Sequence, residues 1–156
     1  MASLERPRLT PEGKIEIEQE LEFLRTTKYP QLHEHISEMS EEGDVSDNSE
    51  YEEVRDELNR VRSRMEDIDL LLSEAIVSSG GDSGTVAFGS TVTVVNTANG
   101  TELVYRIVSP HEANPGQKRI SNTSPVGMAL LGKQVGDSVT INSPNGTLTL
   151  DIRDVR

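Results

Sequence analysis

Cysteine and tryptophan are both absent from this 156-residue chain, and apolar residues make up only 33% of it. Without cysteine the chain can form no disulfide framework and offers no thiolate for catalysis or metal binding. No run approaches the roughly 18 apolar residues of a membrane-spanning helix, and the N-terminal MASLERPRLT has no apolar signal-peptide core. We therefore expect a cytoplasmic protein with no membrane partner, folded as one ordinary domain or two small ones.

Basic residues are fewer than acidic ones, and the whole acidic excess lies in one half of the chain. Residues 1–78 hold 9 basic and 21 acidic residues, whereas residues 79–156 hold 6 of each, so the first half carries the whole net charge of −12. This asymmetry indicates two parts with different roles. Nucleic-acid phosphates would repel the first half, so a basic partner or metal ions would have to mediate any approach.

The first half has the apolar spacing of two helices. Thr10 and Pro11 form a helix start, as the cap and the first helical residue. The first apolar stripe is Ile17, Leu21, Leu24, Leu32, Ile36 and Met39. This stripe slips after Leu24, where Pro30 predicts a kink or marks the slip.

The second helix has a cleaner seam with alternating spacings of three and four residues. Its members are Tyr51, Val54, Leu58, Val61, Met65, Ile68 and Leu72. Two helices of similar length with a short connection predict an antiparallel coiled-coil hairpin, an arm over residues 1–78 with its tip near 43–50. Because the hairpin closes on itself, we expect a monomer.

The second half changes to the period of strands. Residues 79–84 read as a linker, and residues 85–156 as a small β-rich domain, so the fold class is α+β. Strands are expected at 86–88, 91–95, 102–108, 137–142 and 147–152, with turns at Asn99-Gly100 and Asn145-Gly146. Ser124 and Pro125 start a short helix that runs to Leu131 and stops at Gly132.

The stretch EEGDVSDNSEYEEV, residues 41–54, carries seven acids and no Lys or Arg. Gly43 permits a bend, and the run from Asp47 through Asn48 to Glu50 matches a capping box for the second helix. Asp44 has no comparable local role in forming the bend or in starting the helix. It is either a solvated turn residue or, with Asp47, a ligand for Mg²⁺, which takes one or two carboxylates and completes its shell from elsewhere.

Several segments resemble the Gre family of transcript-cleavage factors. GDVSDNSEY is similar to that family's tip motif, commonly GDLKENAEY, and LTPEGKIEIEQELEFLRTTKYPQL resembles its first helix. In the second half, FGSTVTVVN, VYRIVSPHEA and SPVGMALLGKQVGD resemble the C-terminal domain. The resemblance covers nearly the whole chain and implies a coiled-coil arm followed by a small FKBP-like β-rich domain.

The resemblance also implies a function and its residues. Such a factor binds bacterial RNA polymerase and inserts its arm into the secondary channel. Asp44 and Asp47 then share a Mg²⁺ ion with the polymerase, which cleaves the 3′ end of backtracked RNA. The factor is not itself an enzyme, and alone it binds no cofactor. Gly43, Asn48, Glu50 and Tyr51 would support the tip.

Two departures leave an alternative open. The family usually has Glu where Asp47 stands and often Lys or Arg where Ser46 stands, so a Gre-like inhibitor that binds polymerase without stimulating cleavage is the second hypothesis. A coiled-coil adaptor or chaperone is the third. Prolyl isomerase activity is disfavoured, because only Phe88 and Tyr105 supply aromatic rings in this half. Lys118, Arg119 and Lys133 are either solvated or docking residues for an acidic polymerase surface.

Overall fold

The computed structural model describes residues 6–41, 49–80 and 84–156, which form two compact units. The arm unit is Lys14–Ala75, and the C-terminal unit combines Met1–Gly13 with Ile76–Arg156. The linker expected at residues 79–84 stays a prediction, since residues 81–83 lie outside the described part. Among the described residues, no helix has both the length and the apolar character to cross a membrane.

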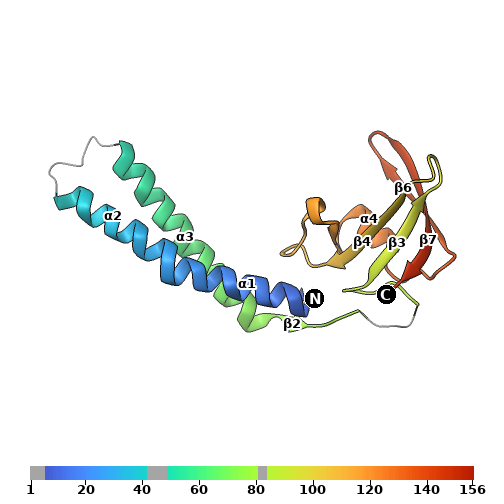
Figure 1. The fold of residues 1–156 in the computed structure, drawn as a ribbon, viewed down its shortest axis with the longest axis horizontal. Helices are drawn as coiled ribbons and strands as arrows, with labels where there is room; N and C mark the ends of the chain where they lie inside the picture. Colours follow the sequence, from blue (N-terminus) through green and yellow to red (C-terminus); the bar gives the residue numbers. More distant parts are fainter. Residues whose placement is uncertain (1–5, 42–48, 81–83) are drawn as a thin grey trace, which may run out of the picture. The chain divides into compact units, whose positions relative to one another are not determined.

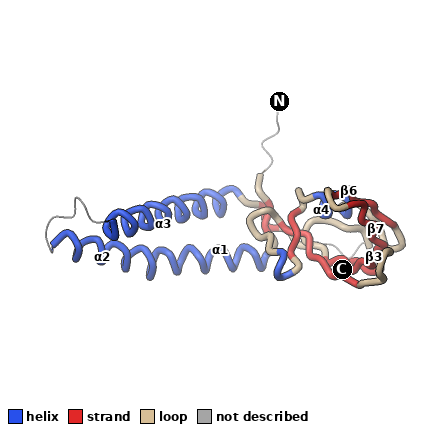
Figure 2. Tube along the Cα trace, turned by 90° about the horizontal axis from the view of Figure 1, so that it is seen from above, coloured by secondary structure: helices blue, strands red, loops and turns tan. Residues whose placement is uncertain are grey.

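The arm is a helical hairpin, as the sequence predicted. One side consists of α1 (Pro11–Phe23), a π-helix (Leu24–Lys28) and α2 (Tyr29–Glu41), and α3 (Ser49–Glu74) returns along it. Figure 1 shows α1 and α2 following one another, and in Figure 2 the antiparallel α3 lies beside them. The buried residues of α3 are Leu58, Val61, Ile68 and Leu71. The other members of the predicted seam are half-buried, so the seam is confirmed, and the buried Leu71 at its end is an addition that the sequence did not predict.

The π-helix explains the slip in the first apolar stripe. The Tyr29 N–H donates to the Leu24 carbonyl five residues back, so this turn holds one residue more than an α-helical turn. The extra residue restores the apolar face, with Leu24 buried on one side of the bulge and Leu32 half-buried on the other. Pro30, which has no N–H to donate, lies just beyond the bulge, where a regular ladder could not be completed.

A curled five-stranded sheet forms the C-terminal unit (Figure 1). Its strand order is β5-β4-β3-β7-β6, with all neighbours antiparallel except β4 and β5. The strands are β3 (Thr91–Asn96), β4 (Glu102–Val108), β5 (Arg119–Ser121), β6 (Ser138–Ser143) and β7 (Gly146–Val155). A 3₁₀ turn (Pro115–Gln117) precedes β5, and α4 (Pro125–Leu130) follows it. The core includes Val92, Ile107, Leu130, Leu150 and Ile152.

Most of the expected elements in this unit are present. Ser124 caps α4, with its Oγ accepting from the Gly127 N–H at 3.1 Å, and the helix ends at Leu130 before Gly132 at φ 80°. The last hairpin also forms, but Ser143 pairs with Gly146, so its turn is Pro144-Asn145. The α+β class is therefore confirmed.

The prediction of a strand at residues 86–88 is wrong. Val86 and Phe88 are buried, which produced the alternating pattern. Their backbone is a loop, because the Val86 N–H donates to the Lys133 carbonyl and the chain turns at Gly89, which has a φ of 86°. Val86 is bonded through its backbone to the loop after α4, and its side chain joins the core of the unit.

The sequence did not predict the strand pair at the start of the C-terminal unit. There β1 (Arg8–Leu9) runs parallel to β2 (Ile76–Val77). The Ile76 N–H donates to the Pro7 carbonyl at 2.8 Å and the Ser78 N–H to the Leu9 carbonyl at 2.9 Å. Leu9 is fully buried, so the segment before α1 is packed within this unit.

Candidate functional site

The tip lies between the end of α2 at Glu41 and the start of α3 at Ser49. Gly43, Asp44, Asp47 and Asn48 lie outside the described residues, so their predicted roles stay predictions. Glu50 and Tyr51 lie in the first turn of α3, where an acid such as Glu50 interacts favourably with the positive end of the helix dipole.

The end of the arm around the tip contains only acidic charge. Residues 29–54 carry nine acidic residues and no Lys or Arg. The six that the structure describes are all exposed: Glu34, Glu38, Glu41, Glu50, Glu52 and Glu53. Exposed carboxylates in a stretch without Lys or Arg repel phosphates and attract metal ions.

One contact near the tip was not foreseen. His35 Nε2 on α2 lies 3.7 Å from Glu50 Oε1 on α3, and both side chains are well exposed. Glu50 therefore faces the opposite helix, a contact that the capping and tip-support roles expected from the sequence did not include. Nothing in the spacing of these residues predicts the pair, because it forms only when the helices fold back on each other.

Farther from the tip, three of the arm's basic residues form ion pairs between its two sides. Three pairs span the hairpin: Arg64–Glu20 at 2.7 Å, Lys28–Glu57 at 2.8 Å and Arg25–Asp69 at 3.3 Å. The hydrogen bond from Arg64 lowers the pKa of Glu20, and bonds from Lys28 and then Arg60 lower the pKa of Glu57. These pairs stabilise the part of the arm away from the tip, here called the shaft, whereas residues 29–54 contain no Lys or Arg.

The described residues contain no group of three or more His, Asp or Glu side chains that could hold a metal ion. The predicted pair, Asp44 and Asp47, lies outside this search. Two carboxylates on an exposed tip would fill only part of the shell of Mg²⁺, which retains several waters and takes further oxygens from a substrate or partner. These residue types therefore suit a shared ion.

The predicted docking residues occupy two places in the C-terminal unit. Lys118 is exposed and adopts φ 60°, the left-handed region, directly before β5. Arg119 is half-buried at the start of β5, and its guanidinium donates to Gln117. Lys133 is exposed in the loop after α4. Lys118 and Arg119 are thus neighbours beside β4, and no described contact joins Lys133 to them.

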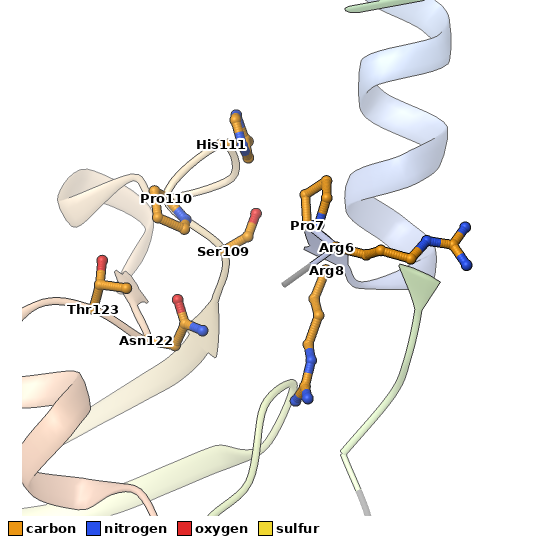
Figure 3. A pocket seen from close by; sticks show the side chains of 8 residues that line it. All are labelled: Arg6, Pro7, Arg8, Ser109, Pro110, His111, Asn122 and Thr123. Atoms are coloured by element: carbon orange, nitrogen blue, oxygen red, sulfur yellow. The ribbon is translucent and has the colours of Figure 1, made fainter. Parts of the chain in front are cut away.

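A hollow of about 290 Å³ lies within the C-terminal unit (Figure 3). Residues 6–8 line one side, and residues 109–111 with 122–123 line the other. None of these is Phe, Tyr or Trp, while Phe88 is buried and Tyr105 half-buried in the unit itself. The hollow therefore lacks the aromatic walls expected of a proline-binding site and offers no support for prolyl isomerase activity.

Comparison with known proteins covers both halves of the chain. The family described as "Transcription elongation factor, N-terminal" matches residues 8–77, and "Transcription elongation factor, GreA/GreB, C-term" matches residues 81–156. Transcription elongation factor GreA of Bacillus anthracis is 39% identical over 150 residues, 95% of each chain. GreA of Chloroflexus aurantiacus is 42% identical over 150 residues, 95% of this chain and 96% of the relative.

Among solved structures, the chain is similar to the GreA factor homolog 1 (Gfh1) protein of Thermus thermophilus. That protein is 29% identical, the match covers 97% of this chain and 99% of the other, and the TM-score is 0.46.

Proposed function

The chain belongs to the GreA/GreB family of transcription elongation factors, and we propose that it stimulates RNA cleavage by backtracked bacterial RNA polymerase. In this proposal the arm enters the secondary channel and brings its tip to the extruded RNA 3′ end. Asp44 and Asp47 hold a Mg²⁺ ion jointly with the polymerase. The polymerase cuts the RNA, and the factor, a cytoplasmic monomer, is not a catalyst on its own.

The observation that carries this proposal is the strongly acidic composition of the distal arm. Residues 29–54 have nine acids and no Lys or Arg, whereas three cations of the shaft, Arg25, Lys28 and Arg64, join its two sides. A structural helix surface would gain from mixed charge, since like charges at short spacing destabilise it. A surface that must deliver carboxylates to metal ions gains from having no competing cation.

The chemistry follows from how a second metal ion acts on a phosphodiester. Two ions lying about 4 Å apart activate the attacking oxygen and stabilise the leaving one. Carboxylates at the tip would raise the affinity of the second ion and orient its water. Binding needs a separate surface, for which Lys118 and Arg119 of the C-terminal unit are the candidates against an acidic partner.

The test is a cleavage assay on a stalled, backtracked elongation complex with the purified protein and Mg²⁺. Shortening of the labelled RNA from its 3′ end is expected, with loss in Asp44→Ala and weakening in Asp47→Ala. Glu66→Ala is the matched control, because it removes an exposed acid of α3 that lies outside the acidic stretch of residues 29–54. Equal activity of all three variants would contradict the assigned role of the tip.

A second candidate rests on two residues that depart from the Gre tip motif, Asp47 and Ser46. Asp is one methylene shorter than Glu, and misplacement by about 1 Å can cost on the order of 100-fold in rate. A Gre-like inhibitor would bind polymerase and slow RNA synthesis without shortening the transcript. An adaptor or chaperone would show no polymerase binding, an outcome that would overturn both proposals.

A further inference from the structure

Glu112, in the turn after β4, is a buried acid that the proposed chemistry does not use. Its side chain is only 7% exposed. Its carboxylate accepts hydrogen bonds from the Thr10 N–H at 3.0 Å, from the Thr10 hydroxyl, and from the Ser109 hydroxyl at 3.2 Å. A buried carboxylate is stable only when such donors replace its water. The contact with Thr10 spans 102 positions of sequence.

Thr10 also caps α1, so the carboxylate holds the helix start itself. The Thr10 hydroxyl oxygen accepts from the Gly13 N–H at 3.1 Å while its hydrogen is directed to Glu112. Gly13 packs directly against the acid, since a Cβ at this position would lie 1.7 Å from Glu112 Oε1. Glycine is costly inside a helix, and this contact explains its presence.

A second charged contact binds the same turn to the rest of the C-terminal unit. Arg106 of β4 donates to Glu12 at 2.7 Å. The pKa of Glu12 is lowered, chiefly by a backbone hydrogen bond and then by Arg106. The first turn of α1 is thus bonded both to β4 and to the turn that follows it, and residues 6–8 lie on the other side of the hollow from Ser109 and His111 (Figure 3).

The contact between Glu112 and Thr10 matters because of how the chain connects the two units. The chain passes between the two units at residues 13–14 and at residues 75–76. Residues before 14 precede the arm in sequence, so only non-covalent contacts attach them to the rest of the C-terminal unit. If those contacts were lost, a single covalent connection at residues 75–76 would join the arm to that unit.

We propose that Glu112 is a positioning residue whose carboxylate holds the first turn of α1 on the C-terminal unit and so secures the second attachment of the arm. The functional part of this inference rests on the proposed cleavage activity. With one attachment, the tip would spend less time at the polymerase active site, because a single tether lowers its effective concentration there. Docking through the C-terminal unit would be unchanged.

Hydrogen exchange, measured without polymerase, tests the contact. Hydrogen exchange of the Thr10 and Gly13 amides should accelerate at least about tenfold in Glu112→Ala, with little change for amides of the central strand β3. Glu112→Gln keeps one acceptor and should lie between. Glu102→Ala, which removes an exposed acid from the same unit, is the control and should change nothing. Unchanged exchange at Thr10 in Glu112→Ala would overturn the proposal.

The packing against Gly13 provides a reciprocal test. Gly13→Ala alone should accelerate exchange at Thr10, because the added methyl displaces the carboxylate. In the Glu112→Ala background the same substitution should be neutral or slightly raise the melting temperature, since Ala favours helix over Gly. Equal effects of Gly13→Ala in both backgrounds would show that the two residues are not coupled, against the proposal.

The cleavage assay then separates positioning from folding. Glu112→Ala should lower the maximal cleavage rate several-fold at saturating factor and leave the half-saturating concentration unchanged, with partial recovery in Glu112→Gln. A raised half-saturating concentration with an unchanged maximum would contradict a positioning role. If the wild-type protein stimulates no cleavage, the proposed function fails, whereas the exchange and packing results still decide whether Glu112 holds α1.

Discussion

Arg64 on α3 donates two hydrogen bonds, at 2.7 and 2.9 Å, to the carboxylate of Glu20 on α1. This bidentate contact joins the two sides of the hairpin. It lowers the pKa of Glu20 and raises the pKa of Arg64, with the hydrogen bond as the largest cause in both cases. Together with the Lys28–Glu57 pair, it stabilises the shaft of the arm.

The Arg64–Glu20 pair makes the arm sensitive to acid. Because the folded-state pKa of Glu20 lies below its ordinary value of 4.5, the pair stabilises fully above about that pH and is lost as pH falls through the folded-state pKa. At neutral pH, Arg64→Gln should reduce the free energy of unfolding by about 0.3–1 kcal/mol, as for a partly exposed pair.

Urea unfolding followed by helical circular dichroism checks this at pH 7 and below pH 4.5. The difference between wild type and Arg64→Gln should shrink at the lower pH. Arg55→Gln, an exposed substitution on the same helix, should show no such pH dependence. A constant difference across this range would mean that the Glu20 carboxylate is not the partner that matters.

Lengthening the second tip acid should strengthen the proposed activity. Asp47→Glu restores the side chain usual in the Gre tip motif and is expected to raise the cleavage rate by several-fold up to about 100-fold, the cost of a 1 Å misplacement. Asp47→Asn, which keeps the shorter length but loses the charge, should lower it. The measurement is the initial rate of 3′ RNA cleavage at fixed Mg²⁺, and equal rates for Asp and Glu would remove chain length as a factor.

The seam of the hairpin should dominate the stability of the arm. Ile68 is fully buried on α3, and Ile68→Ala should cost about 2–4 kcal/mol through lost burial and the cavity left behind. Leu70, two residues on, is 57% exposed, and Leu70→Ala should change stability by less than about 0.5 kcal/mol. Comparable losses in thermal unfolding would place Leu70 in a contact that the described residues do not show.

Close packing under α4 predicts a strong effect of one methyl group. A Cβ at Gly127 would lie 2.0 Å from the Ser121 carbonyl oxygen, so Gly127→Ala must shift α4 or the end of β5. We expect a loss of about 1–3 kcal/mol, as for overpacked cores. The neighbouring Met128 is 64% exposed, and Met128→Ala should be nearly neutral. Thermal unfolding of both variants distinguishes local packing from a general intolerance of α4.

The sequence predicted elements that depend on neighbouring residues. The seam from Tyr51 onward marked α3, the Asn99-Gly100 turn marked the hairpin of β3 and β4, and Ser124-Pro125 marked the start of α4. In each case the residues that form the pattern lie within the helix or hairpin that the pattern predicts. The tip motif likewise pointed to the Gre family, because its chemistry is concentrated in nine residues.

Only the tertiary structure decided the contacts between distant segments. The parallel pairing of β4 with β5, the pairing of β1 with β2, and the bonds from Thr10 to Glu112 join residues that no local pattern relates. Val86 and Phe88 are the opposite case. Both side chains are buried by tertiary packing, so the alternating pattern predicted a strand where the backbone forms a loop. Local propensity and periodicity were enough to define the arm and its acidic tip. How the start of α1 is held depended on a buried carboxylate, whose partner becomes evident only when the chain has folded.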